Sequence, residues 1–346
     1  MKFPILAFVI WRLFLFIPVN QFSLAPWANF DGLHYLSIAI NGYTFDGRFF
    51  PLYPFLIKLF SLPFNFPEAF IYSGFLISNL FFLLSLILFY KLVKMNFSEK
   101  VAKESLIWML IFPTSFFFVS VYSESLFLFL TLLSFYFAEK SKWVFASIAG
   151  FFLGVTRLTG IFILPSLIYE FLKKEKSNSL KIFPLFLIPV GLISFAVFCF
   201  YKWGDALYFI KAHGSLGNSR SVDFIILPFQ TIYRYFKIFF SVSYTQYEFW
   251  IALLELAMFI LVSFLIYLGW KKKLNPSWLI FSLLTFLLPS FSGTFSGLPR
   301  YVITIFPIFI VLALIKNKAF KISYAIISPI LLIILLVLFS RGYFVA

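Results

Sequence analysis

Long runs of apolar residues recur along the whole chain and restrict it to one class of fold. The run at 322–340 holds no charged side chain. A helix needs about 20 mostly apolar residues, and at least roughly 17, to cross the hydrocarbon core of a bilayer. Hydrophobic residues make up 62% of the chain and charged residues 12%, whereas soluble domains average about 25% charged residues. The sequence therefore predicts an all-α, polytopic integral membrane protein.

Roughly eleven such runs are predicted to be membrane spans, several short enough to be re-entrant or tilted. They lie near residues 3–19, 70–93, 104–118, 121–138, 143–156, 159–172, 182–201, 249–270, 276–292, 301–315 and 322–340. No clear signal-peptide cleavage site follows the first predicted span, so this span is expected to be retained. Without an internal repeat or a linker, residues 1–346 are expected to form a single membrane domain.

Lysine clusters fall on alternate connections between these spans. They comprise Lys91, Lys94, Lys100 and Lys103; Lys140 and Lys142; Lys173, Lys174, Lys176 and Lys181; Lys271, Lys272 and Lys273; and Lys316, Lys318 and Lys321. Lysine-rich loops stay in the cytoplasm, so we expect a multi-pass cell-membrane protein with a cytoplasmic N-terminus and an extracytoplasmic C-terminus. The opposite face then receives both long segments, 20–69 and 202–248. The second is predicted to include an amphipathic helix at the membrane interface.

That outer face also collects the residues suited to chemistry. It holds Asp31, Asp46, Asp205 and Asp223, both histidines, Glu124, and Arg48, Arg157, Arg220, Arg234 and Arg300. This division was not used to choose the spans and therefore supports them. The active site is accordingly expected on the extracytoplasmic side.

Several classes of function are disfavoured by what the sequence does not contain. The single cysteine, Cys199, excludes a disulfide or a CxxC redox pair within one chain. Two histidines are too few for a typical His-rich metal site. The net charge of +15 is explained by the lysine loops and not by a basic helix for nucleic acid. No P-loop, dinucleotide-binding fingerprint, HExxH or GxSxG motif is present. No cofactor is expected.

The segment WANFDGLHYLSIAINGY at 27–43 carries the first candidate residues. Asp31 lies at the start of a short helix predicted over 33–40, where it could cap that helix or act as a general base on an acceptor hydroxyl. His34 shares its helical face and could bind a phosphate or sugar hydroxyl, or make a structural hydrogen bond. Tyr35 lies one turn on.

Arg48 precedes FFPLYP at 49–54. The two prolines of FFPLYP disfavour a continuous helix and stiffen the loop. A rigid aromatic wall beside a cation suits a lipid phosphate, and it equally suits anchoring at the membrane interface.

Two further charges are enclosed by apolar sequence. Glu124 lies within PTSFFFVSVYSESL and Arg157 within TRLTG, on the same predicted side of the membrane. Ionisable residues in such surroundings pair or line a cavity. The two could form a structural ion pair, or Arg157 could face a phosphate while Glu124 orients it.

Arg300, in GLPRY, opens the tenth predicted span. Its planar guanidinium suits phosphate oxygens, although simple extension to the interface is an alternative. For Lys202, Asp205, His213 and Arg220, which lie in a segment containing glycine and serine, plain solvation is favoured.

These pieces resemble the GPI mannosyltransferase II family and its prokaryotic relatives, within the GT-C class of membrane glycosyltransferases. The resemblance rests on WxxFDGLHYLSIAxxGY with FFPLYP, on PTSFFFVSVYSESLF at 113–127 and on TRLTG at 156–160, with LPRY at 298–301 as a weaker fourth piece. It implies a GT-C-like helical bundle with a catalytic first extracytoplasmic loop and interfacial helices.

The resemblance further implies inverting transfer of mannose or a related hexose from a polyprenyl-phosphate carrier to a glycolipid or glycan acceptor. Asp31 would be the base. Arg157 and Arg300 would stabilise the leaving phosphate, with Arg48, His34 and Glu124 also at the substrate. Secondary candidates are Tyr35, Tyr53, Tyr122 and Lys202. No metal is required in this picture.

Two other functions remain open from the residues. A secondary transporter or lipid flippase would carry ionisable residues near the bilayer centre and usually repeated halves, whereas the charges here gather at one face. A non-catalytic membrane scaffold would tolerate the loss of Asp31 and Arg157.

Overall fold

The computed structural model describes residues 2–19, 23–44, 46–66, 68–175, 180–214, 220–222 and 224–346. Within these ranges the chain is helical, without strands, apart from an isolated bridge between Ile226 and Ser292. Asp223 and Lys176, which the sequence analysis assigned to opposite faces, lie outside the described residues. The prediction of an all-α fold is confirmed.

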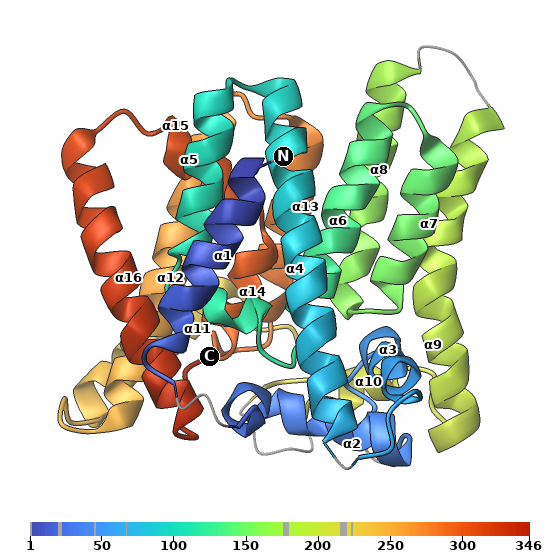
Figure 1. The fold of residues 1–346 in the computed structure, drawn as a ribbon, viewed down its shortest axis with the longest axis horizontal. Coiled ribbons are helices and arrows are strands. Elements are labelled where there is room, and N and C mark those ends of the chain that lie inside the picture. The colour runs from blue at the N-terminus through green and yellow to red at the C-terminus, as the bar shows by residue number, and fades with distance from the viewer. Residues whose placement is uncertain are drawn as a thin grey trace.

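The longer helices run roughly alongside one another in Figure 1. They are α1 (Lys2–Phe16), α4 (Ala69–Asn96), α5 (Glu99–Leu110), α6 (Glu124–Glu139), α7 (Trp143–Gly154), α8 (Ile163–Lys174), α9 (Leu187–Trp203), α12 (Tyr247–Lys271), α13 (Pro276–Ser290), α15 (Pro307–Leu314) and α16 (Lys318–Ser340).

Shorter elements connect them. These are the 3-10 helices η1 (Ala25–Ala28), η2 (Ser115–Phe118), η3 (Leu158–Phe162), η4 (Leu180–Phe186) and η5 (Val302–Thr304), and the helices α2 (Asp31–Asn41), α3 (Leu52–Ser61), α10 (Tyr208–Lys211), α11 (Pro228–Ser241) and α14 (Leu298–Tyr301).

Four stretches of helix in the described part of the chain are long and apolar enough to cross a membrane: Ala69–Asn96, Leu180–Trp203, Tyr247–Lys271 and Lys318–Ser340. Each of the other predicted spans contains a shorter helix. The predicted span 104–118 stops being α-helical at Leu110, and in 301–315 the last helix begins only at Pro307. Each of these two predicted spans contains a proline, Pro113 in the first and Pro307 in the second, and proline lacks the N–H that a helix interior needs. The count of eleven spans therefore stays a prediction.

Lysine ion pairs tie helix ends together at one end of the bundle. Lys321 of α16 lies 2.5 Å from Glu104 of α5, and Lys174 of α8 lies 2.7 Å from Glu139 of α6. In Figure 1 the α4–α5 and α15–α16 connections and the N-terminus lie at the upper end, whereas α2, α3 and α10 lie at the lower end. The lysine-rich connections and the first loop are thus at opposite ends.

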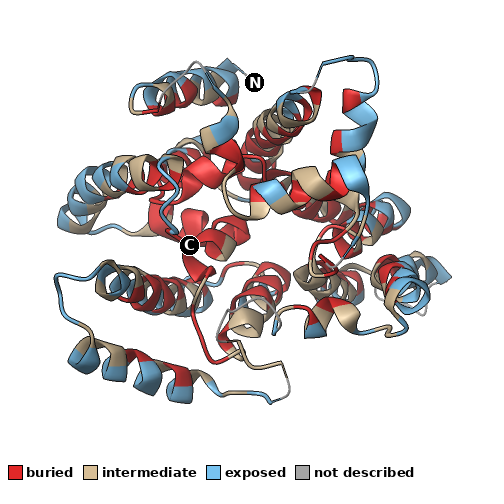
Figure 2. Ribbon diagram, turned by 90° about the horizontal axis from the view of Figure 1, so that it is seen from below, coloured by how far each residue is buried: buried red, intermediate tan, exposed pale blue. Residues whose placement is uncertain are grey.

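Apolar side chains cover the outside of the bundle as well as its core. Figure 2 shows buried residues concentrated toward the centre and exposed ones on the outer helices. On α16, every fourth residue from Ile322 to Ile334 is an exposed isoleucine. Residues four apart share one helical face, so this stripe presents the apolar surface that a lipid-facing helix requires.

The segment expected to contain an amphipathic helix does so as α11. Thr231 and Tyr235 are buried on its inner side, while Phe229, Phe236 and Phe240 are exposed. Two side chains of α11 form hydrogen bonds with the loop before α14. The Arg234 guanidinium donates to the Gly293 carbonyl at 3.2 Å, and the Tyr235 hydroxyl accepts from the Phe295 N–H at 2.9 Å.

Candidate functional site

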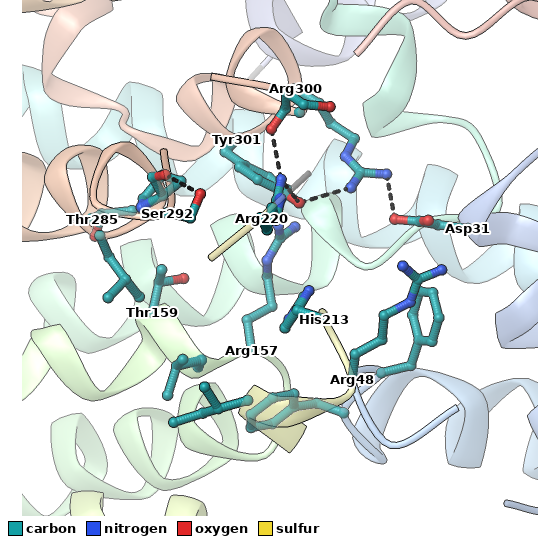
Figure 3. A pocket seen from close by; sticks show the side chains of 18 of the residues that line it. Asp31, Arg48, Arg157, Thr159, His213, Arg220, Thr285, Ser292, Arg300 and Tyr301 are labelled. Atoms are coloured by element: carbon teal, nitrogen blue, oxygen red, sulfur yellow. Dashed lines mark hydrogen bonds and ion pairs between the residues drawn. The ribbon is translucent and has the colours of Figure 1, made fainter. Parts of the chain in front are cut away.

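A cavity of about 380 Å³ opens near the end of the bundle that carries α2 and α3. Its lining combines charged and aromatic side chains from segments far apart in sequence, as Figure 3 shows. The lining includes Asp31, Tyr35, Arg48, Phe49, Glu124, Arg157, His213, Arg220, Arg300 and Tyr301.

Asp31 is the first residue of α2, and its carboxylate points away from that helix. The N-cap position belongs to Phe30, whose φ is 56°, and no side chain caps the helix. Instead, Oδ2 of Asp31 lies 2.7 Å from Nη1 of Arg300. The capping interpretation is therefore wrong, because a charged partner across the cavity holds the carboxylate.

Arg300 reaches Asp31 from the short helix α14. Gly297 precedes that helix with a φ of 78°, a left-handed conformation that glycine adopts without penalty. The Thr114 hydroxyl donates to the Pro299 carbonyl at 2.5 Å and fixes the turn. The guanidinium also lies over the Tyr122 ring, 5.1 Å from its centroid. Arg300 is thus held from two sides before any ligand binds.

Glu124, the first residue of α6, connects Arg300 to Arg157. Its Oε1 accepts a hydrogen bond from Nη1 of Arg157 at 2.6 Å and lies 3.3 Å from Nε of Arg300. Arg157 occupies the turn between α7 and η3. Of the two interpretations from the sequence, the ion pair between Glu124 and Arg157 is confirmed.

The two carboxylates differ in access to the cavity. The side chain of Asp31 is 26% exposed, whereas that of Glu124 is 2% exposed. Both carboxylates line the cavity, but a substrate hydroxyl has more room to approach Asp31 than Glu124. This difference separates a carboxylate able to exchange protons with a ligand from one that neutralises arginines.

The charge state of Asp31 follows from its neighbours. Burial alone raises the pKa of a carboxyl group, but the positive charges of Arg300 and Arg48 outweigh it and hold the pKa of Asp31 below its ordinary value of 3.8. Asp31 is thus ionised at neutral pH and able to accept a proton.

Hydrogen bonds to backbone carbonyls hold the segments around this site together. The Val121 N–H donates to the Trp27 carbonyl at 2.8 Å, and the Leu52 N–H donates to the Val155 carbonyl at 3.0 Å. The Tyr122 hydroxyl donates to the Asn29 carbonyl at 2.7 Å. The first and third of these bonds join the 27–43 and 113–127 motifs, and the second joins FFPLYP to the residue just before TRLTG, so these segments form one scaffold for the cavity.

Arg48 lies in the cavity lining, as expected of a substrate-binding residue. Its guanidinium stacks 4.8 Å from the centroid of the Phe49 ring. The expected interruption of helix by the two prolines holds only for Pro51, because α3 begins at Leu52 and includes Pro54. Proline is tolerated in a first helical turn, where its missing N–H has no intrahelical partner.

Of the other sequence candidates, only Tyr35 lines the cavity among the described residues. Tyr35 lines the cavity and exchanges a hydrogen bond with Ser123 at 2.9 Å. His34 instead turns to Asp46, with Nδ1 3.1 Å from Oδ1. Tyr53 is buried against Ser78 at 2.7 Å, and Lys202 is exposed on α9. His34, Tyr53, Tyr122 and Lys202 are not among the residues that line the cavity in the described chain.

The sequence pattern did not identify His213 and Arg220 as cavity residues. Solvation was favoured for both, and this is wrong, because both line the cavity. Burial, together with the smaller effect of the Arg220 and Arg48 charges, lowers the pKa of His213 to about 3. The available signal was the segregation of arginines from lysines, since four arginines line the cavity and no lysine does among the described residues.

Comparison with known proteins supports the expected family. Residues 18–174 match the family described as mannosyltransferase (PIG-V). This region contains the first three motifs, including Asp31, Glu124 and Arg157. The resemblance inferred from these motifs is therefore confirmed.

Crystal structures of the oligosaccharyltransferase of Archaeoglobus fulgidus share the fold. The form tethered through a disulfide bond to an acceptor peptide with an NVT sequon has 14% identity and a TM-score of 0.53, covering 98% of this chain and 55% of that one. The complex with Zn and sulfate has 14% identity and a TM-score of 0.50, with coverage of 97% and 53%. The apo form has 12% identity and a TM-score of 0.54, with coverage of 100% and 56%.

This chain thus spans about half the length of the oligosaccharyltransferase that it resembles. At these identities the likeness establishes a GT-C fold alone. No curated protein sequence matches the chain. The family match and the fold together support a membrane glycosyltransferase.

Proposed function

We propose, from the mannosyltransferase (PIG-V) match of residues 18–174, that the protein transfers mannose or a related hexose from a polyprenyl phosphate to a glycolipid or glycan hydroxyl. The reaction takes place in the cavity at the end of α2, on the extracytoplasmic side of the cell membrane. The N-terminus and the lysine-rich connections lie on the cytoplasmic side, following the distribution of lysine.

One observation carries the proposal: a partly exposed carboxylate, Asp31, shares a 380 Å³ cavity with four arginines. A sugar transfer from a lipid phosphate needs one group to accept a proton and several to stabilise an oxyanion. The cavity contains both at the end of an apolar bundle.

In the proposed reaction, the acceptor oxygen attacks C1 of the hexose from the face opposite the phosphate. The new C1–O bond forms as the bond from C1 to the phosphate oxygen breaks, so the configuration at C1 inverts. The acceptor proton passes to Asp31, and the electron pair of the broken bond leaves with the lipid phosphate. The low pKa of Asp31 is sufficient, since the attacking hydroxyl becomes strongly acidic as its bond to C1 forms.

The leaving group gains a negative charge in this step. A phosphodiester carries one negative charge, and the monoester that leaves carries roughly 1.5 to 2. Arginines already fixed around the cavity stabilise this developing charge without reorganising. No step of the proposed mechanism passes through a metal ion.

The apolar part of the lining suits the start of a lipid chain. Ile225, Leu288 and Phe291 line the same cavity as the arginines. A ligand with a charged head and an apolar tail matches this arrangement, whereas a soluble nucleotide-sugar would leave those walls unused. The lining therefore favours a lipid-linked donor.

The decisive experiment replaces Asp31 with asparagine in the purified protein. With a polyprenyl-phosphate hexose donor and a glycolipid acceptor, we expect the rate of hexose transfer to fall by roughly 10²- to 10⁴-fold, the usual range for removal of a general base. Asp31→Asn preserves shape, so the thermal unfolding midpoint separates loss of chemistry from loss of fold.

Asp205→Asn is the matched control. Asp205 is paired with Lys211 at 2.5 Å and does not line the cavity, so transfer is expected at the wild-type rate. Near-normal transfer by Asp31→Asn would remove the assigned base. A wild-type protein that moves the lipid across sealed vesicles and forms no glycosidic product would identify a flippase instead.

A further inference from the structure

The charges in the cavity do not cancel. Its lining holds the arginines Arg48, Arg157, Arg220 and Arg300 and the carboxylates Asp31 and Glu124. Arg300 is paired with Asp31 at 2.7 Å, and Arg157 with Glu124 at 2.6 Å. Within the described chain, Arg48 and Arg220 form no ion pair with a carboxylate. Among the described residues, the cavity lining therefore keeps two positive charges without a paired carboxylate.

Arg48 is held in place while its charge stays available. The guanidinium stacks on Phe49, which in turn stacks on His34 with ring centroids 5.0 Å apart. Nε of Arg48 is buried and has no hydrogen-bond partner among the described residues. Figure 3 shows its guanidinium turned toward Asp31, across a gap that no direct contact closes. Its charge nevertheless lowers the pKa of Asp31.

Among the described residues, Arg220 is hydrogen-bonded through Nη2 alone. Its Nη2 donates to the Ser296 carbonyl at 2.6 Å and lies 3.4 Å from the Tyr301 hydroxyl. Nε is buried without a partner among the described residues. A guanidinium has five N–H donors, so most of those on Arg220 have no partner among the described residues. An unpaired buried donor is costly, and this cost is removed when an anion binds.

We infer that Arg48 and Arg220 bind the phosphate group of the lipid donor, while Arg157 and Arg300 are held by Glu124 and Asp31. The inference rests on the proposed function and reassigns the phosphate role, which the sequence analysis gave first to Arg157 and Arg300. The planar forks of arginine match phosphate oxygens. Two free cations also match the additional charge that the phosphate gains as it leaves.

His213 supports this division of roles. It lines the same cavity, and in Figure 3 it lies between the side chains of Arg48 and Arg157 and below that of Arg220. The charges of Arg220 and Arg48 both lower its pKa, so the two cations act on one region of the cavity. A neutral imidazole there does not add a third charge, and it leaves the two arginines as the matched pair for one phosphate.

The test measures binding of the leaving group, which needs no hexose transfer. The probes are a short-chain polyprenyl phosphate, the corresponding polyprenyl alcohol and inorganic phosphate, each titrated into the detergent-solubilised protein. We expect the wild type to bind the polyprenyl phosphate more tightly than either other probe. Arg48→Gln and Arg220→Gln should each weaken it by roughly tenfold or more, as expected for loss of hydrogen bonds to a charged group.

Arg341→Gln is the control, since Arg341 is exposed beyond α16 and outside the cavity lining; its affinity should match the wild type. Arg48→Lys and Arg220→Lys keep the charge but lose the planar fork, so each should restore part of the affinity lost in its glutamine variant. Wild-type affinity in the Arg48→Gln/Arg220→Gln double variant, with an unchanged melting temperature, would overturn the inference. Equal affinity for inorganic and lipid phosphate would overturn its lipid part.

The outcome separates this inference from the proposed function. If the arginine variants lose lipid phosphate and the wild type transfers no hexose, the binding pair stands and the proposed reaction fails. If the wild type transfers hexose and the double variant binds lipid phosphate normally, the reaction stands and the pair fails.

Discussion

The guanidinium of Arg300 lies 2.7 Å from the carboxylate of Asp31, and the same guanidinium lies 3.3 Å from Glu124. Arg300 therefore stands between a carboxylate that is partly exposed in the cavity and one that is almost fully buried. Because it holds Asp31 ionised, a change at Arg300 alters the proton affinity of the proposed base as well as the local charge.

The first prediction concerns the variant Arg300→Gln. Burial raises the pKa of Asp31, and Arg300 is the strongest of the charges that lower it. Without that charge, burial dominates and the pKa rises. Asp31 must be ionised to accept a proton, so the acid limb of kcat/KM should move to higher pH. In the wild type it should lie below pH 3.8, the ordinary value for this carboxyl.

The pH profile of residual hexose transfer tests this shift, with Arg341→Gln as the control. An acid limb that stays in place in Arg300→Gln would show that Asp31 is not the group that titrates. The lowered pKa of Asp31 also makes the stability of the fold depend on pH. The lowered pKa of Asp31 stabilises the fold above pH about 3.8, and this contribution disappears as the pH falls through the lowered value.

The second prediction concerns His213. Its pKa is lowered to about 3, so the imidazole should stay neutral from pH 8 down to pH 5. The chain has two histidines, and in the variant His34→Gln only His213 remains. The NMR signals of isotope-labelled histidine in that variant should not shift between pH 8 and pH 5. A titration centred near pH 6.5 would contradict the burial of this side chain.

The same residue has a consequence for stability. Below pH about 6.5 the unfolded chain binds a proton at His213 that the folded chain does not bind. Stability therefore falls as the pH drops below that value. Replacing His213 with glutamine should weaken this dependence, which chemical denaturation at pH 7 and pH 5 can measure.

Part of this site could be predicted from the sequence. Glu124 and Arg157 are enclosed by apolar residues, and two opposite charges in such surroundings must neutralise each other or a ligand. This requirement is local, so the pair could be anticipated without coordinates. Arg48 was likewise recognised beside two prolines that stiffen its loop, and Asp31 as a carboxylate at the start of a predicted short helix with His34 nearby.

The remainder depended on tertiary packing. Asp31 could cap its own helix by every local criterion, and only the position of Arg300 across the cavity decides otherwise. His213 and Arg220 lie in a segment with the composition of a solvated loop, and they line the cavity because segments distant in sequence pack around them. Sequence pattern describes a residue's neighbours along the chain, whereas these roles depend on neighbours across it.

The third prediction compares two ion pairs of different burial. Glu124 is sealed between Arg157 and Arg300, so Glu124→Ala leaves two cations without their shared counter-charge. Breaking a buried pair costs about 3–5 kcal/mol. Glu104→Ala removes the partner of Lys321 at a more exposed position, where about 1 kcal/mol or less is expected. Thermal and chemical unfolding in detergent measure both, and equal losses would contradict the sealed character of Glu124.

The fourth prediction concerns Gly160, in the motif that carries Arg157. A Cβ added at this glycine would lie 2.2 Å from the Leu153 carbonyl oxygen and 3.0 Å from the Gly154 nitrogen. Both atoms belong to the backbone of α7 and cannot rotate away, so Gly160→Ala forces η3 to move from the end of α7. Overpacking of this kind costs about 1–3 kcal/mol, and the unfolding free energy should fall by that amount.

The same displacement should reduce activity, because Arg157 lies in the turn between α7 and η3 and contacts Glu124 at 2.6 Å. We expect kcat/KM for hexose transfer to fall in Gly160→Ala even at temperatures where the protein stays folded. Val144→Ala, at an exposed position on the same helix, should change stability by no more than about 0.5 kcal/mol. Wild-type activity and stability in Gly160→Ala would show that the turn can shift without disturbing the ion pair, and that Gly160 is not needed to position Arg157.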